Sequence, residues 1–245
     1  NITKADIENF YKTHFVPQGT RISIVGDLQK YDIAHMFEKH FENWSGSELK
    51  DMIFPAISPE EKKQVVYPIN RDQVVVLFAK PSIDRLHNDY DKLLLFEQIF
   101  CGSSMSSRLF QLRERSGLFY TISGSMMGHA DEQPGVFMVK TIVSLNRLEE
   151  AKKAILETMQ TVIDTITEQE LEEAKHAVIN AQVNNFAANR RIGYCFLAVD
   201  RFNFSEDYFD TRAQTIHAIT LDEVKDAARR VIDCEKLVTF EIGRV

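Results

Sequence analysis

Residues 2–27 read ITKADIENFYKTHFVPQGTRISIVGD, and residues 219–244 read ITLDEVKDAARRVIDCEKLVTFEIGR. The two segments align without a gap at an offset of 217 residues, so that Thr3 meets Thr220. Each contains a Thr-x-x-acid capping box, an amphipathic helix, a polar turn and a β-rich strand that ends in Gly. We therefore expect a chain that holds the end of one half-domain and the whole of a second, related one.

The composition allows a sizeable core, because 44% of the 245 residues are hydrophobic. A net charge of −7, without a basic stripe, argues against nucleic acid and anionic membranes as partners. The longest apolar run, Val74–Ala79, has the length of a buried strand, so we expect a soluble protein with no membrane span. Asn1 stands in mid-pattern without a Met or a signal peptide, which favours a fragment; the missing N-terminal part could contain a targeting sequence.

Three cysteines, Cys101, Cys195 and Cys234, are odd in number and far apart in the chain. This spacing favours buried free thiols over a disulfide framework or a CxxC metal site. It mildly favours a reducing compartment, although a periplasmic protein with few cysteines fits as well. The compartment stays open between the cytoplasm, the periplasm and, in a eukaryote, an organellar matrix.

Residues 43–61 break every periodicity and contain Gly46 and two prolines, which predicts a linker. The hairpin strands and the block of helices that follow indicate an α+β fold, a mainly antiparallel sheet with helices packed on one face. The predicted elements are a helix at 3–15, a strand at 21–25, a helix at 30–40, strands at 64–69 and 73–80, a helix at 89–100, a short helix from Ser106 or Ser107 to a C-cap at Gly117, hairpin strands at 118–127 and 135–144, helices capped by Asn146 and by the box Thr167–Glu170, a helix at 190–202, and the closing helix and strand.

The segment His35-Met-Phe-Glu-Lys-His40 is close to a zinc motif but differs from it in spacing. Zinc-binding His-x-x-Glu-His and His-Glu-x-x-His place their histidines four apart, on one helical face. Here the two histidines are five apart, which puts them about 140° out of phase on a helix. The solvated face of an amphipathic helix is the better interpretation, and we expect no metal site in this chain.

Residues 106–120, SSRLFQLRERSGLFY, form the second candidate site. Arg113 lies in the predicted last turn of a short helix, Gly117 lets the chain reverse, and Tyr120 lies near the start of the next strand. A guanidinium and a phenol hydroxyl at one place suit a peptide carbonyl, since Arg can hold it and Tyr can donate to the oxygen as charge develops. From the residues alone, a surface charge and a packing tyrosine are the better explanation of the two residues.

The same stretch resembles the signature of the second, non-zinc half of the pitrilysin/insulinase/mitochondrial-processing-peptidase family. Residues 10–28, FYKTHFVPQGTRISIVGDL, resemble the segment near the end of the zinc-binding half of that family. The resemblance covers essentially the whole chain in order, and two near-duplicate halves are what the family has.

The resemblance implies a zinc metallopeptidase of two similar α+β halves that close around an unfolded peptide bound in extended form. Residues 1–45 would be the helix–strand–helix tail of the preceding zinc-binding half, 46–62 the linker, and 63–245 the substrate-positioning half-domain. Arg113 would bind a substrate carbonyl and Tyr120 would stabilise the oxyanion. Zinc and the general-base Glu would come from the missing half, on the same chain or on a separate subunit.

No His-x-x-Glu-His occurs in the 245 residues. The motif could lie upstream of Asn1, or the parent protein could lack it and act beside a zinc-bearing subunit; in either case we expect this chain alone to be inactive. The alternative is a structural or peptide-presenting homologue, such as a core subunit of a respiratory complex, and a third possibility is an unrelated α+β binding domain. The apolar residues of 1–45 also predict packing on the second half or a homodimer of the fragment.

Overall fold

The computed structural model describes residues 1–46, 54–55 and 64–244. The chain divides into two compact units, one made of Asn1–Ala56 with Val183–Phe209, the other of Ile57–Gln182 with Asp210–Val245. Most of the predicted linker 46–62 lies outside the described residues, and the half-domain boundaries at 45 and 63 stay a prediction.

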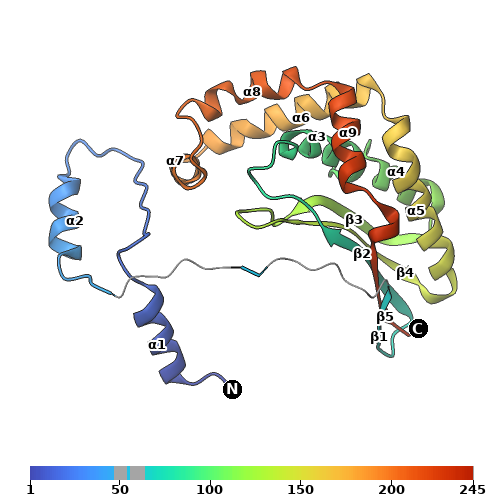
Figure 1. Ribbon diagram of the computed structural model, residues 1–245, viewed down its shortest axis with the longest axis horizontal. Coiled ribbons are helices and arrows are strands. Elements are labelled where there is room, and N and C mark those ends of the chain that lie inside the picture. Colours follow the sequence, from blue (N-terminus) through green and yellow to red (C-terminus); the bar gives the residue numbers. More distant parts are fainter. Residues whose placement is uncertain (47–53, 56–63, 245) are drawn as a thin grey trace. The chain divides into compact units, whose positions relative to one another are not determined.

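A five-stranded sheet with the order β1-β5-β2-β4-β3 forms the centre of the second unit (Figure 1). Its strands are β1 (Gln64–Pro68), β2 (Gln73–Pro81), β3 (Phe119–Gly128), β4 (Val136–Ser144) and β5 (Val238–Gly243). The pairs β5–β2, β2–β4 and β4–β3 are antiparallel, whereas β1 and β5 run parallel. The predicted α+β fold with a mainly antiparallel sheet is thereby confirmed, and the β3–β4 hairpin lies where the sequence predicts it.

Helices cover one face of this sheet (Figure 1). They are α3 (Tyr90–Cys101), α4 (Arg108–Ser116), α5 (Leu148–Thr165), α6 (Glu168–Phe186), α8 (Tyr208–Ala218) and α9 (Leu221–Val231), with 3-10 turns at Leu145–Arg147 and Cys234–Lys236. α6 and α8 each have one end in the first unit and the other in the second.

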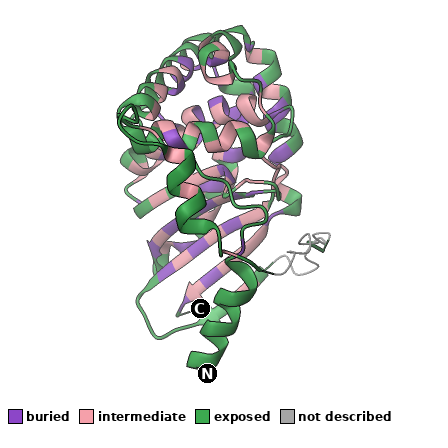
Figure 2. Cartoon of the chain, turned by 90° about the vertical axis from the view of Figure 1, so that its left-hand side faces the viewer, coloured by how far each residue is buried: buried purple, intermediate pink, exposed green. Residues whose placement is uncertain are grey.

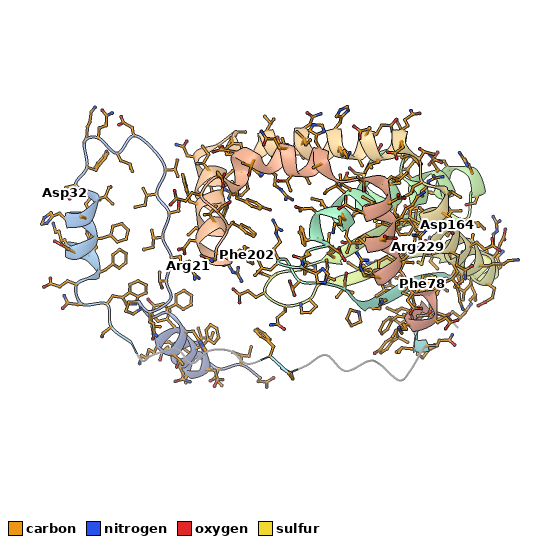
Figure 3. The ribbon with its side chains drawn as sticks, turned by 45° about the horizontal axis from the view of Figure 1, so that its top comes forward. Arg21, Asp32, Phe78, Asp164, Phe202 and Arg229 are labelled. Atoms are coloured by element: carbon orange, nitrogen blue, oxygen red, sulfur yellow. The ribbon has the colours of Figure 1, made fainter. Side chains whose placement is uncertain are left out.

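The alternation of β2 shows which face carries the core. Val74, Val76 and Phe78 are fully buried beneath the helices, and Phe78 is labelled in Figure 3. Residues 75, 77 and 79 between them lie on the opposite face and are only half-buried. Each fully buried Val or Phe side chain stabilises the fold by about 1.5–3 kcal/mol relative to exposure, so the helix-covered face supplies most of the stability of the sheet.

The first unit contains α1 (Lys4–His14), α2 (Ile33–Phe41) and α7 (Asn189–Phe202). The predicted capping box of α1 forms, with the backbone N–H of Thr3 donating to the Asp6 carboxylate over 2.8 Å. The box of α9 has the same geometry, with the N–H of Thr220 donating to Glu223 over 2.8 Å. Nevertheless, α1 has no buried residue, and the helix beside the N-terminus is exposed throughout in Figure 2.

Four local predictions differ from the structure. Residues 21–25 form no strand, because no described strand pairs with them to complete a ladder. Asn146 does not cap α5; it lies inside the 3-10 turn before it, and Arg147 is the N-cap residue. Ser107 is the N-cap of α4, yet its side chain makes no cap hydrogen bond. Helix α8 was not predicted, since it buries only Arg212 and Ile216 and so has a weak apolar stripe.

Candidate functional site

The candidate site lies on α4 and at the beginning of β3. Leu109 anchors α4, because it is the buried residue of this helix. Gly117 ends the helix in the left-handed conformation, at φ 60°, and its N–H donates to the carbonyl of Arg113 over 3.2 Å. Glycine fits this conformation without strain, so the chain reverses within one residue and enters β3. The predicted C-cap is confirmed.

Arg113 lies in the last turn of α4 and is half-buried. Its guanidinium makes no hydrogen bond or ion pair with the part of the chain that the structure describes. The neighbouring Arg108 differs, because its guanidinium bonds to the carbonyl of Thr165 over 3.0 Å and to the carboxylate of Glu170 over 2.8 Å. Arg108 thus fixes α4 against the helical layer, whereas the donors of Arg113 are available to a ligand.

Tyr120 occupies an irregular position of β3. Phe119 pairs with Val143 and Thr121 pairs with Ile142. Two residues of β3 therefore correspond to a single step along β4. Tyr120 is the additional residue of this β-bulge, and its side chain is 69% exposed. Bulges turn a side chain away from the regular alternation and are frequent beside functional sites. β3 is also an outermost strand of the described sheet.

Arg113 and Tyr120 lie on two elements that follow one another in the chain and pack together. Arg113 is in the last turn of α4, and Tyr120 is the second residue of β3. α4 packs on β3, and the glycine turn joins the two elements. The sequence predicts a site at both residues, a role that stays a prediction, but it predicts neither the bulge at Tyr120 nor the anchor at Arg108. Bulges have no reliable sequence signal. Arg108 does have one, because it belongs to the SSRL stretch of the same candidate site.

Metal ligation and thiol chemistry have little support in the described residues. Groups of three or more His, Cys, Asp or Glu side chains with metal-binding geometry are absent from residues 1–46, 54–55 and 64–244. The three cysteines are free and half-buried. Burial and the nearby Glu97 raise the pKa of the Cys101 thiol well above its ordinary value, so this thiol is not activated as a nucleophile. No helix in the described residues has the length and hydropathy to cross a membrane.

The cavities near α4 are small. One of about 160 Å³ lies between α4 and α5, lined by Arg108, Arg115 and a row of threonines, and another of about 110 Å³ lies between α3 and α6. Neither includes Arg113 or Tyr120. The candidate site is therefore a surface that presents donors to a partner or an extended ligand, without an enclosed pocket of its own among these cavities.

Comparison with known proteins identifies the family. The family model described as the peptidase M16 inactive domain matches residues 1–178. The chain belongs to this family. Comparison with curated proteins gives no match.

Solved structures agree with the M16 fold. A peptidase M16 inactive domain from Pseudomonas fluorescens superposes with a TM-score of 0.86 at 23% identity, over 100% of this chain and 58% of that one. A protease from Helicobacter pylori gives 0.82 at 17% identity, over 99% and 59%. Complex III2 from Candida albicans gives 0.67 at 13% identity, over 87% and 53%. This M16 chain thus spans less than two thirds of each of these relatives, and at such identities the likeness shows the fold alone.

Proposed function

We propose that this chain is the substrate-binding half of a zinc-dependent metalloendopeptidase, which cleaves extended peptides between two α+β halves. The observation that carries the proposal is the exposed Tyr120 at a bulge, next to a helix whose Arg113 has donors available. Membership of the M16 inactive-domain family supports it, and so does the likeness to the Helicobacter pylori protease.

Each of the two residues has a role that its chemistry explains. The planar guanidinium of Arg113 would donate to the backbone carbonyl of a bound peptide and hold it in register. The hydroxyl of Tyr120 would donate to the carbonyl oxygen as negative charge develops on it during attack, which stabilises the transition state more than the ground state. Arg108 would act as a positioning residue, because it holds α4, and with it Arg113, against the helical layer.

The metal chemistry belongs elsewhere in this proposal. The described residues offer no clustered donor set for zinc, so zinc would be bound by the other half, on the same polypeptide or on a separate subunit. When bound there it would supply the activated water; the chain described here would supply binding and orientation. We accordingly propose that this chain alone cleaves nothing and that its partners are a zinc-binding half and an unfolded peptide.

Peptide cleavage by the native protein, with Tyr120→Phe and Arg113→Ala compared with wild type, tests the proposal. Loss of an oxyanion donor typically lowers kcat by about 10²–10³-fold, and we expect that loss for Tyr120→Phe with a nearly unchanged KM. Tyr67→Phe is the matched control, since Tyr67 is 54% exposed on β1. Arg115→Ala plays the same part for Arg113 on α4.

Two outcomes would contradict the proposal: cleavage that survives a chelator, or Tyr120→Phe that cleaves like Tyr67→Phe. Wild-type protein with no chelator-sensitive cleavage of unfolded peptides would favour the structural or peptide-presenting alternative. The likeness to Complex III2 from Candida albicans is compatible with that alternative.

A further inference from the structure

The five described strands contain three charged side chains, and two of these have partners within the fold. The ammonium of Lys80 donates to the carbonyl of Val231 over 2.8 Å. The carboxylate of Glu241 accepts a hydrogen bond from Lys152 over 2.6 Å. The third, Lys140 in the middle of β4, makes no hydrogen bond or ion pair with the residues that the structure describes. Its donors are therefore available to a ligand.

Lys140 lies on the face of the sheet opposite the helices, which we call the helix-free face. Side chains alternate between the two faces of a strand, and the neighbours of Lys140 in β4, Val139 and Thr141, are fully buried on the helix-covered face (Figure 1). Lys140 itself is exposed. Its ammonium is thus accessible to a molecule that binds the helix-free face.

The positions around Lys140 on this face supply no carboxylate. Leu77 of β2 and Ser123 of β3 lie opposite it on the two neighbouring strands. Met138 and Ile142 lie two residues away on β4 itself. The diagonal positions are also uncharged, and they are Val75, Ala79, Thr121 and Ser125. An anionic group brought to Lys140 therefore meets no competing negative charge at the adjacent positions of the sheet.

Lys140 also lies at a defined spacing from the candidate site. Ser123, which is opposite Lys140, comes three residues after Tyr120 in β3. A strand rises about 3.3 Å per residue, so these three residues span about 10 Å. An extended peptide advances by a similar amount per residue. A peptide with a carbonyl at Tyr120 that follows β3 therefore brings a side chain about three residues away to Lys140.

The rest of the face suits the apolar parts of such a peptide. Phe240 of β5 lies opposite Leu77, and Ile242 lies opposite Val75. All four side chains are half-buried, so each has apolar surface left to cover. A peptide on this surface would bury apolar area and also displace water from around Lys140, which strengthens an ion pair formed there.

We propose that Lys140 is a specificity-determining residue, which binds an acidic side chain of an extended peptide about three residues from the peptide bond that faces Tyr120. The occupant of the helix-free face is then a peptide with Asp or Glu at that position and apolar residues beside it. Charge complementarity favours this occupant, since the charged group presented by the strands on this face is a cation without a partner among the described residues. The inference rests on the proposed function for the place of the peptide, but not on catalysis.

Peptide binding tests the pairing. The probe is a short, unfolded, end-capped peptide with one Glu and otherwise neutral residues, and its counterparts carry Gln or Lys at the same position. Fluorescence anisotropy with the native protein, in the presence of a chelator that prevents cleavage, gives the affinities. We expect wild type to bind the Glu peptide about 3–5-fold more tightly than the Gln peptide, and the difference to shrink in about 1 M salt.

Three variants assign the preference to one side chain. Lys140→Met should lose it, because Met keeps the length and apolar stem of the side chain without its charge. Lys140→Glu should reverse it in favour of the Lys peptide, a result that loss of the fold could not imitate. Lys153→Met is the matched control, since Lys153 is 77% exposed on α5, and it should bind like wild type. Equal binding of the Glu and Gln peptides by wild type, binding of neither, or a preference that survives Lys140→Met overturns the proposal.

The cut position tests the spacing. In cleavage by the native protein, the main cut should lie about three residues from the Glu and should move with the Glu when it is shifted along the peptide. Cuts that ignore the Glu overturn this spacing. The two proposals fail separately. Lys140-dependent binding without cleavage removes only the catalytic role of Tyr120, whereas Tyr120-dependent cleavage without a preference for Glu removes only the role of Lys140.

Discussion

Lys152 of α5 places its ammonium 2.6 Å from the carboxylate of Glu241, a residue of β5 that is only 3% exposed. Glu241 lies on the helix-covered face, beside fully buried Val76 of β2. A carboxylate in this place needs its partner, because an unpaired buried charge costs more than the pair contributes.

Lys152→Met should lower the free energy of unfolding by about 3–5 kcal/mol, since it leaves the Glu241 carboxylate buried and unpaired. Lys152→Met/Glu241→Leu should recover most of that loss, because an apolar pair has no desolvation penalty. Urea titrations at pH 7 provide the comparison, with Lys153→Met on the exposed side of α5 as the control. If the double variant is as unstable as Lys152→Met, the charge is not the cause.

Asp89 should make stability depend on acid pH. Burial by itself raises the pKa of Asp89, but hydrogen bonds from Lys92, over 3.0 Å, and from Arg230, over 2.8 Å, outweigh it and hold the pKa below its ordinary value of 3.8. A lowered folded-state pKa contributes stability that is present above about pH 3.8 and lost as the pH falls through the folded value.

We expect Asp89→Asn to be less stable than wild type by about 1–3 kcal/mol at pH 6. The difference should shrink as the pH falls below 3.8 towards the folded pKa. Urea titrations between pH 6 and pH 2.5 measure it, with Asp72→Asn as the control because the Asp72 side chain is 95% exposed. A constant difference over that range would show that titration of Asp89 does not contribute.

Gly117→Ala should destabilise the protein through backbone strain alone. The residue has φ 60°, and a Cβ there would meet nothing within 4 Å, so no steric clash adds to the cost. Forcing alanine into the left-handed region costs about 1–2 kcal/mol. Gly26→Ala is the matched control, since its Cβ also meets open space but its φ is not positive. Equal effects in thermal melts of the two variants would argue against strain.

The sequence predicts those parts of the fold that depend on local interactions. The capping boxes at Thr3 and Thr220, the C-cap at Gly117 and the β3–β4 hairpin each follow from residues within a few positions of one another. Arg113 and Tyr120 are predicted as site residues because a glycine turn brings the end of one element to the start of the next, again a local relation, and because their stretch resembles a family signature; their role stays a prediction.

Features that need a distant partner were not predictable in the same way. The parallel pairing of β1 with β5 places Gln64 opposite Thr239. The sequence of neither strand indicates which strand it pairs with. The same reason applies to the ion pair between Lys152 and Glu241. Residues 21–25 have a strand pattern, but a strand requires a neighbour, and the described residues supply none.

Glu97 protects the outer strand of the sheet. Its carboxylate accepts hydrogen bonds from the Ser125 hydroxyl over 2.9 Å and from the N–H of fully buried Met126 over 2.6 Å, beside the second bulge of β3.

Glu97→Ala leaves the N–H of Met126 unsatisfied and should cost about 1–3 kcal/mol of stability. It also opens the edge of β3 to pairing with another molecule, so light scattering should show association on mild heating. Glu97→Gln retains an acceptor oxygen and should lose much less on both measures. Glu114→Ala, at an exposed position of α4, should change neither. If Glu97→Gln behaves like Glu97→Ala, the negative charge rather than the hydrogen bond to the edge is what β3 requires.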